Sequence, residues 1–150
     1  MAKTERSPIV SQYVWLMRIL GVVYALVGIL FFFFPKEVFY LINVGPRLFA
    51  TAGVAPSLLP IPDQTESFWL VLATSMMAML SALSFLAAES PKVRGYALVH
   101  VLSKTVSVAG FIFLFLNDTR YFAYLVGVAT DLPLAIAVTI THLRAAGAKG

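Results

Sequence analysis

Four long apolar runs constrain the fold of this chain more than any other feature. They extend from about Tyr13 to Phe34, Phe68 to Ala88, Val93 to Leu116 and Tyr121 to His142. Crossing about 30 Å of hydrocarbon takes roughly 20 apolar residues in a helix, because lipid offers the backbone no hydrogen-bond partners. We therefore predict an all-α fold, an integral membrane four-helix bundle that forms a single domain over residues 1–150.

The composition agrees with a membrane location and argues against other classes. The chain is 60% hydrophobic and 12% charged, whereas roughly 25% of residues are charged in a typical soluble domain. Cysteine is absent, which excludes disulfides, iron–sulfur clusters and cysteine nucleophiles. The net charge is +4, but Lys and Arg are scattered at the ends of the apolar runs. We therefore expect the lipid bilayer as a partner, and no nucleic acid.

Basic residues are distributed unevenly between the two ends of the predicted spans. The side with the termini receives seven of them, and the other side three: Lys3, Arg6, Arg18, Lys92, Arg94, Arg144 and Lys149, against Lys36, Arg47 and Arg120. Cytoplasmic loops are enriched in Lys and Arg. We therefore expect both termini in the cytoplasm (N-in/C-in) of a multi-pass protein of the bacterial inner (cytoplasmic) membrane. The first run exceeds the roughly 7 to 15 residues of a signal-peptide core, so we expect it to be retained.

The segment between the first two spans, residues 35–67, is apolar but too interrupted to cross a membrane. Gly45-Pro46 and further prolines divide it into short pieces. The piece from Lys36 to Asn43 predicts about two turns of helix at the interface, and Trp69 is expected as an interfacial anchor. We predict an interfacial loop or short helix that packs as a lid on the bundle. A partner-docking surface and a re-entrant pore loop remain alternatives.

Lys104 and Asp131 are ionisable residues at membrane depth, where each costs about 2.5 to 3.5 kcal/mol on insertion scales. Only residues 117–120 separate the third and fourth spans, which predicts a tight antiparallel hairpin. The distances of the two residues from its turn differ by two residues, or about 3 Å of helical rise. We predict an ion pair that fixes the register of the hairpin, or alternatively belongs to a ligand pocket or proton path.

Further polar residues accompany this pair. His100, Lys104 and Ser107 fall at i, i+4 and i+7 on one face of the third span. Pro133 follows Asp131 by two residues and predicts a kink beside the carboxylate. The candidate binding residues are Lys104, Asp131, His100 and Ser107.

The sequence carries no recognisable catalytic or cofactor signature. It lacks a glycine-rich phosphate loop, an HExxH motif and a nucleophile elbow. Its two histidines, His100 and His142, differ by five residues in their distance from the hairpin turn, about 7.5 Å, which does not suit two axial haem ligands. We expect no enzyme and no catalytic residue, and no metal or other cofactor.

Small residues recur at spacings of three and four in the first two spans, which predicts close helix approach. Examples are Gly21, Ala25 and Gly28.

The run Arg18-Ile-Leu-Gly21 with Gly28 resembles small bacterial DoxX-like membrane proteins. The resemblance covers one helix only, and we take no function from it.

Two functions fit these observations. We expect a non-enzymatic structural or accessory subunit of a larger membrane assembly, with other membrane protein subunits as partners. The alternative is a small binding or transport protein whose buried Lys104/Asp131 site holds a quinone, a lipid headgroup or a proton.

Overall fold

The computed structural model describes residues 7–51, 53, 58–62 and 68–147. It has five helices in these ranges: α1 (Pro8–Phe33), α2 (Pro35–Thr51), α3 (Phe68–Glu89), α4 (Arg94–Asn117) and α5 (Phe122–Gly147). All but α2 are long and apolar enough to cross a membrane. The predicted all-helical fold with four candidate spans is therefore confirmed. Lys3, Arg6 and Lys149, which entered the charge count, lie outside the described residues.

The ends of the long helices follow local chemistry. Helix α1 begins at Pro8, before the predicted Tyr13. Ser7 Oγ caps it by accepting a hydrogen bond from Val10 N (3.5 Å), and proline suits the first helical position because an N–H there would have no partner in the helix. It ends where Phe34 leaves the helical conformation, one residue before Pro35 starts α2. The ends of α3 and α4 agree with prediction to within one residue, and α5 continues five residues past His142.

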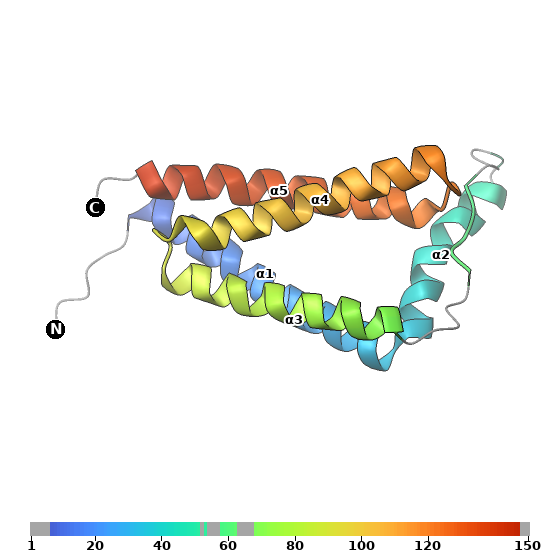
Figure 1. Cartoon of the computed structure of the whole chain (residues 1–150), viewed down its shortest axis with the longest axis horizontal. Coiled ribbons are helices and arrows are strands. Elements are labelled where there is room, and N and C mark those ends of the chain that lie inside the picture. The colour runs from blue at the N-terminus through green and yellow to red at the C-terminus, as the bar shows by residue number, and fades with distance from the viewer. Residues whose placement is uncertain (1–6, 52, 54–57, 63–67, 148–150) are drawn as a thin grey trace.

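The four long helices form two antiparallel pairs, in which α1 packs chiefly on α3 and α4 on α5. Figure 1 shows the pairs close together at the end where α1 begins and α5 ends, and far apart at the end where α2 lies. We call these the terminal end and the α2 end. Burial follows the same division, since no residue from 105 to 130 in α4, α5 or their turn is fully buried. The core therefore sits in the terminal half.

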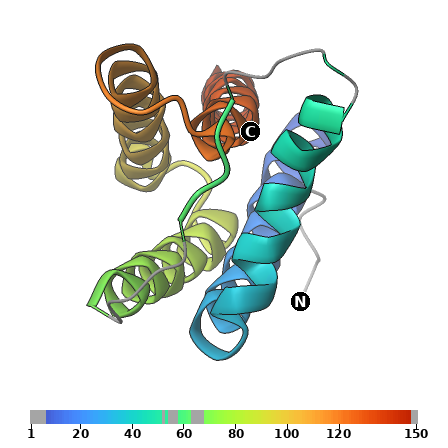
Figure 2. The same cartoon turned by 90° about the vertical axis from the view of Figure 1, so that its right-hand side faces the viewer.

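Helix α2 is longer than predicted, because it continues through Pro46 instead of ending at Asn43. A proline removes one helical hydrogen bond, so packing has to hold the second half of the helix. The ring of Phe49 lies 5.6 Å from that of Phe122, which occupies the space that a Cβ on Gly45 would need. Helix α2 thus crosses the end of the bundle from the α1–α3 pair to the α4–α5 pair (Figure 2).

A short extended segment, residues 58–62, lies beside the turn between α4 and α5. Leu59 N donates to Arg120 O (3.0 Å), and Phe122 N donates to Leu59 O (3.0 Å). The side chain of Asn43 in α2 donates to Ile61 O (2.9 Å) and accepts from Ile61 N (2.8 Å). We call α2 and residues 58–62 the cap, because together they connect both helix pairs at the α2 end.

A candidate binding site in the bundle interior

Lys104 and Asp131 meet in the interior, as the sequence predicts. Lys104 Nζ lies 2.7 Å from Asp131 Oδ1, and the two residues are 6% and 9% exposed. The pairing follows from the short α4–α5 turn, which sets the two side chains at nearly the same height. Pairing offsets much of the cost of burying two charges, while the loss of either partner would leave the other uncompensated.

Tyr24 of α1 packs against the Lys104 side of this pair, and the sequence did not predict it. Its ring centroid lies 5.0 Å from Lys104 Nζ, within the range of a cation–π contact. Its hydroxyl is buried and makes no hydrogen bond with any described residue. Tyr24 continues the helical spacing of Tyr13, Met17 and Leu20, which are also buried. This pattern could have predicted that Tyr24 faces the interior.

His100 joins the cluster through Ser84 of α3, a second residue that the sequence analysis missed. Ser84 Oγ donates its single proton to Leu80 O (2.7 Å), so it accepts a hydrogen bond from His100 Nε2 (2.9 Å). The imidazole ring stacks on Tyr24, with ring centroids 5.7 Å apart. With the proton on Nε2, His100 Nδ1 is a buried acceptor that finds no partner in the described part of the chain.

Ser107 takes no part in these contacts. It is half-buried in α4, one turn from Lys104 toward the α2 end. The structure therefore brings together His100, Lys104 and Asp131 of the candidate residues, adds Tyr24 and Ser84, and leaves Ser107 outside. We call these five residues the polar cluster. Whether they bind a ligand stays a prediction.

A cavity of about 530 Å³ lies nearer the α2 end, and all five helices contribute to its walls. Its lining residues are Phe31, Phe39, Trp69, Leu70, Ala73, Leu114 and Tyr124. Mostly apolar, aromatic walls and a volume in the range of roughly 300 to 1,000 Å³ are typical of pockets for small organic ligands.

The polar cluster and this cavity occupy the same inward helix faces. On α1, Phe31 follows Tyr24 by seven residues, and on α5, Tyr124 precedes Asp131 by seven. Residues seven apart share a helix face and differ in height by about 10 Å. Ser107 lies between the two levels on α4. The cavity is therefore stacked above the polar cluster along the bundle axis.

The two histidines occupy separate surroundings. The ring of His142 lies 5.3 Å from that of Tyr13 near the terminal end, whereas His100 stacks on Tyr24. Within the described ranges, no three His, Cys, Asp or Glu side chains converge in a way that could hold a metal ion.

The fold and the site define a helical bundle of the multi-pass membrane class with a buried polar cluster. Compared with known proteins, the chain matches no family model, no curated protein and no solved structure. Its function therefore has to be argued from the chemistry of its own residues.

Proposed function

We propose that this chain is a non-enzymatic membrane protein that binds a lipid-soluble molecule inside the bundle, with the polar cluster holding the polar group of that molecule. The observation that carries the proposal is the Tyr24 hydroxyl beside the Lys104–Asp131 pair, which has no hydrogen-bond partner among the described residues. A buried polar group without a partner costs about 1 to 3 kcal/mol, and such groups are rare. A ligand that pairs with this hydroxyl would remove the cost. For this reason we propose a binding protein in preference to the accessory subunit that the sequence favours.

The open groups of the polar cluster indicate the chemistry of the ligand. Tyr24 Oη is a donor that no described residue pairs with, and Lys104 has three N–H donors, one of which donates to Asp131 Oδ1. Such donors suit an acceptor oxygen, which a quinone carbonyl or a lipid headgroup supplies. The cavity lies about 10 Å above the polar cluster, so its apolar walls suit a hydrocarbon chain attached to the group that the cluster holds. A quinone with its hydrocarbon tail has both parts, and we propose it as the ligand.

Tryptophan fluorescence can test this proposal, because the chain has two tryptophans in contrasting places. Both are more than half exposed (Trp69 55%, Trp15 62%), but Trp69 lines the cavity and Trp15 does not. In the Trp15→Phe variant, Trp69 is the single tryptophan and is excited selectively over the six tyrosines. We expect decylubiquinone, titrated into the purified variant in detergent, to quench this fluorescence with saturation.

Two controls separate binding from partition into the micelle. The Trp69→Phe variant, which retains Trp15, should show quenching that rises without saturation. The double change Lys104→Met with Asp131→Leu, made in the Trp15→Phe background, removes both charges without leaving one unpaired. Saturable quenching should disappear from this variant while its helix content is kept. Saturable quenching that survives the double change, or that is absent from Trp69 at the start, would refute the proposal.

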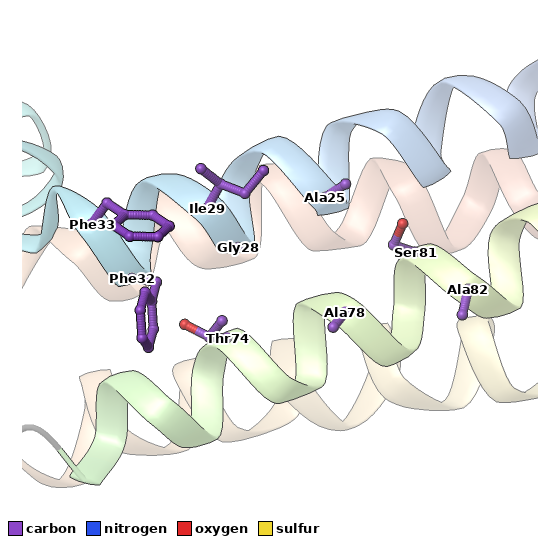
Figure 3. A pocket seen from close by; sticks show the side chains of 9 residues that line it. All are labelled: Ala25, Gly28, Ile29, Phe32, Phe33, Thr74, Ala78, Ser81 and Ala82. Atoms are coloured by element: carbon purple, nitrogen blue, oxygen red, sulfur yellow. The ribbon is translucent and has the colours of Figure 1, made fainter.

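A groove on the outer side of the α1–α3 pair supports a second candidate, the accessory subunit. It measures about 550 Å³ and is lined largely by small residues (Figure 3): Ala25, Gly28, Ile29, Phe32, Phe33, Thr74, Ala78, Ser81 and Ala82. Small side chains let a helix of another subunit approach closely. Mass determination after gentle detergent extraction tests this candidate, since a lone 16.4 kDa monomer would argue against it.

We further propose that both termini face the cytoplasm of a bacterial inner membrane and that the cap lies in the opposite interface. The absence of cysteine makes single-cysteine labelling clean. A membrane-impermeant maleimide should label the Arg120→Cys variant in intact spheroplasts, and the Lys92→Cys variant only after permeabilisation. The reverse pattern would contradict this orientation.

A further inference from the structure

A second groove lies between α4 and α5, near the terminal end of the bundle. Its volume is about 470 Å³, and its lining residues are Arg94, Ala97, Leu98, Val101, Thr139, His142, Leu143 and Ala146. None of them belongs to the polar cluster or to the cavity above it. The walls are mostly apolar, with one cation and one imidazole among them.

The mouth of this groove is positively charged. Arg94 is the first residue of α4, and Val93 before it provides no side-chain cap for the helix N-terminus. Free N–H groups at a helix N-terminus favour an anion, and Arg144 stands in the last turn of α5 at the same end. Glu89 is also at this end, but it forms no ion pair with Arg94. Among the described residues, Lys104 and Asp131 form the one ion pair. Arg94 is therefore available to an anionic group.

His142 gives an independent indication of a ligand. It is 8% exposed and lines the groove, yet its Nδ1 makes no hydrogen bond with any described residue. An unsatisfied polar atom inside an apolar wall is costly. A ligand with polar atoms below its charged group would suit this position.

We propose that the groove binds an anionic phospholipid of the surrounding membrane. The phosphate would lie at Arg94 and the N-terminus of α4, the glycerol ester region near His142, and one acyl chain along Leu98 and Val101. Arg94 and His142 lie together at the terminal end of the groove, and Leu98 and Val101 follow about one and two helical turns further in. A polar headgroup followed by an acyl chain fits this arrangement. Basic pockets between transmembrane helices on the cytoplasmic side are suited to anionic headgroups.

Native mass spectrometry of the purified protein tests this proposal. We would add equal amounts of dioleoylphosphatidylglycerol and dioleoylphosphatidylcholine, which differ in headgroup charge but share their acyl chains. We expect the phosphatidylglycerol adduct to dominate, and the Arg94→Gln variant to lose it about fivefold, because one cation near the surface is removed. The Arg94→Lys variant should retain the preference.

The matched control is Arg18→Gln, because Arg18 is exposed on α1 and does not line the groove. A second variant, Ala146→Phe, fills the groove from an exposed position and should remove the adducts of both lipids. Circular dichroism establishes that each variant keeps its helix content. Equal binding of the two lipids by the unmodified protein would overturn the proposal. So would an Arg94→Gln variant that keeps its adduct, or an equal loss in Arg18→Gln. None of these results depends on quinone binding in the interior.

Discussion

The two halves of this bundle are built in different ways. In the terminal half the four long helices meet around buried residues from every one of them, including Tyr24, Ser84, Lys104 and Asp131. In the α2 half the helix pairs stand apart, and the cap joins them across the end (Figures 1 and 2). The α2 halves of α1 and α4 are more apolar than their terminal halves, which carry Arg18, His100 and Lys104, so hydrophobicity does not explain the difference.

Side-chain size and hydrogen bonding explain it better. In the terminal half, Ala87, Ala88 and Ala97 are almost fully buried, and Ser81 Oγ donates to Gly21 O of the neighbouring helix (2.8 Å). The α2 half of α4 is instead rich in bulky side chains, from Phe111 to Leu116. Lipid tails are as apolar as leucine, so helices associate where small residues allow close packing or polar groups connect them. This distribution accounts for a tightly packed terminal half, which we call the closed half, and an α2 half whose helix pairs stand apart, which we call the open half.

The largest expected effect tests whether the ion pair holds the closed half together. The Asp131→Ala variant leaves Lys104 buried without its carboxylate, which should lower the free energy of unfolding by about 3 to 5 kcal/mol. The double change Lys104→Met with Asp131→Leu should recover most of this loss, since no lone charge remains. Chemical unfolding in detergent measures both. If the double variant is as unstable as the single one, the pair contributes through its own attraction instead.

The sequence predicted the contacts that short connections determine. Four spans follow from hydropathy alone, and the Lys104–Asp131 pair follows from the four residues between two spans. Tyr24 and Ser84 were missed because they come from α1 and α3. The lateral placement of those helices against α4 depends on packing between distant segments, and no spacing in the chain encodes it.

The cap was predicted less well for a similar reason. Proline statistics ended its helix at Asn43, whereas packing against Phe122 carries α2 through Pro46. The hydrogen bonds between Asn43 and Ile61 join residues 18 positions apart. Local propensity determines where a helix is favoured, and tertiary contacts determine where it ends.

A matched pair of leucine truncations tests the contrast between the halves directly. Leu80 is 2% exposed in the terminal half, whereas Leu114 is 36% exposed and lines the cavity of the α2 half. We expect Leu80→Ala to lower the free energy of unfolding by about 2 to 3 kcal/mol, because it leaves a void among packed side chains. Leu114→Ala should cost less than about 1 kcal/mol, since its side chain is only partly enclosed. Equal losses would show that the α2 half is packed as tightly as the terminal half.

A smaller effect than that of Leu80→Ala concerns the cap, which joins the two helix pairs where they do not pack on each other. Asn43 is buried and makes two hydrogen bonds to the backbone of Ile61, so Asn43→Ala should cost about 1 to 2 kcal/mol. We expect the loss to be local. Hydrogen exchange should accelerate in α2 and residues 58–62, while the amides of the terminal half keep their protection. Faster exchange around Lys104 and Asp131 as well would mean that the cap and the polar cluster open as one unit, and the two halves would no longer be independent.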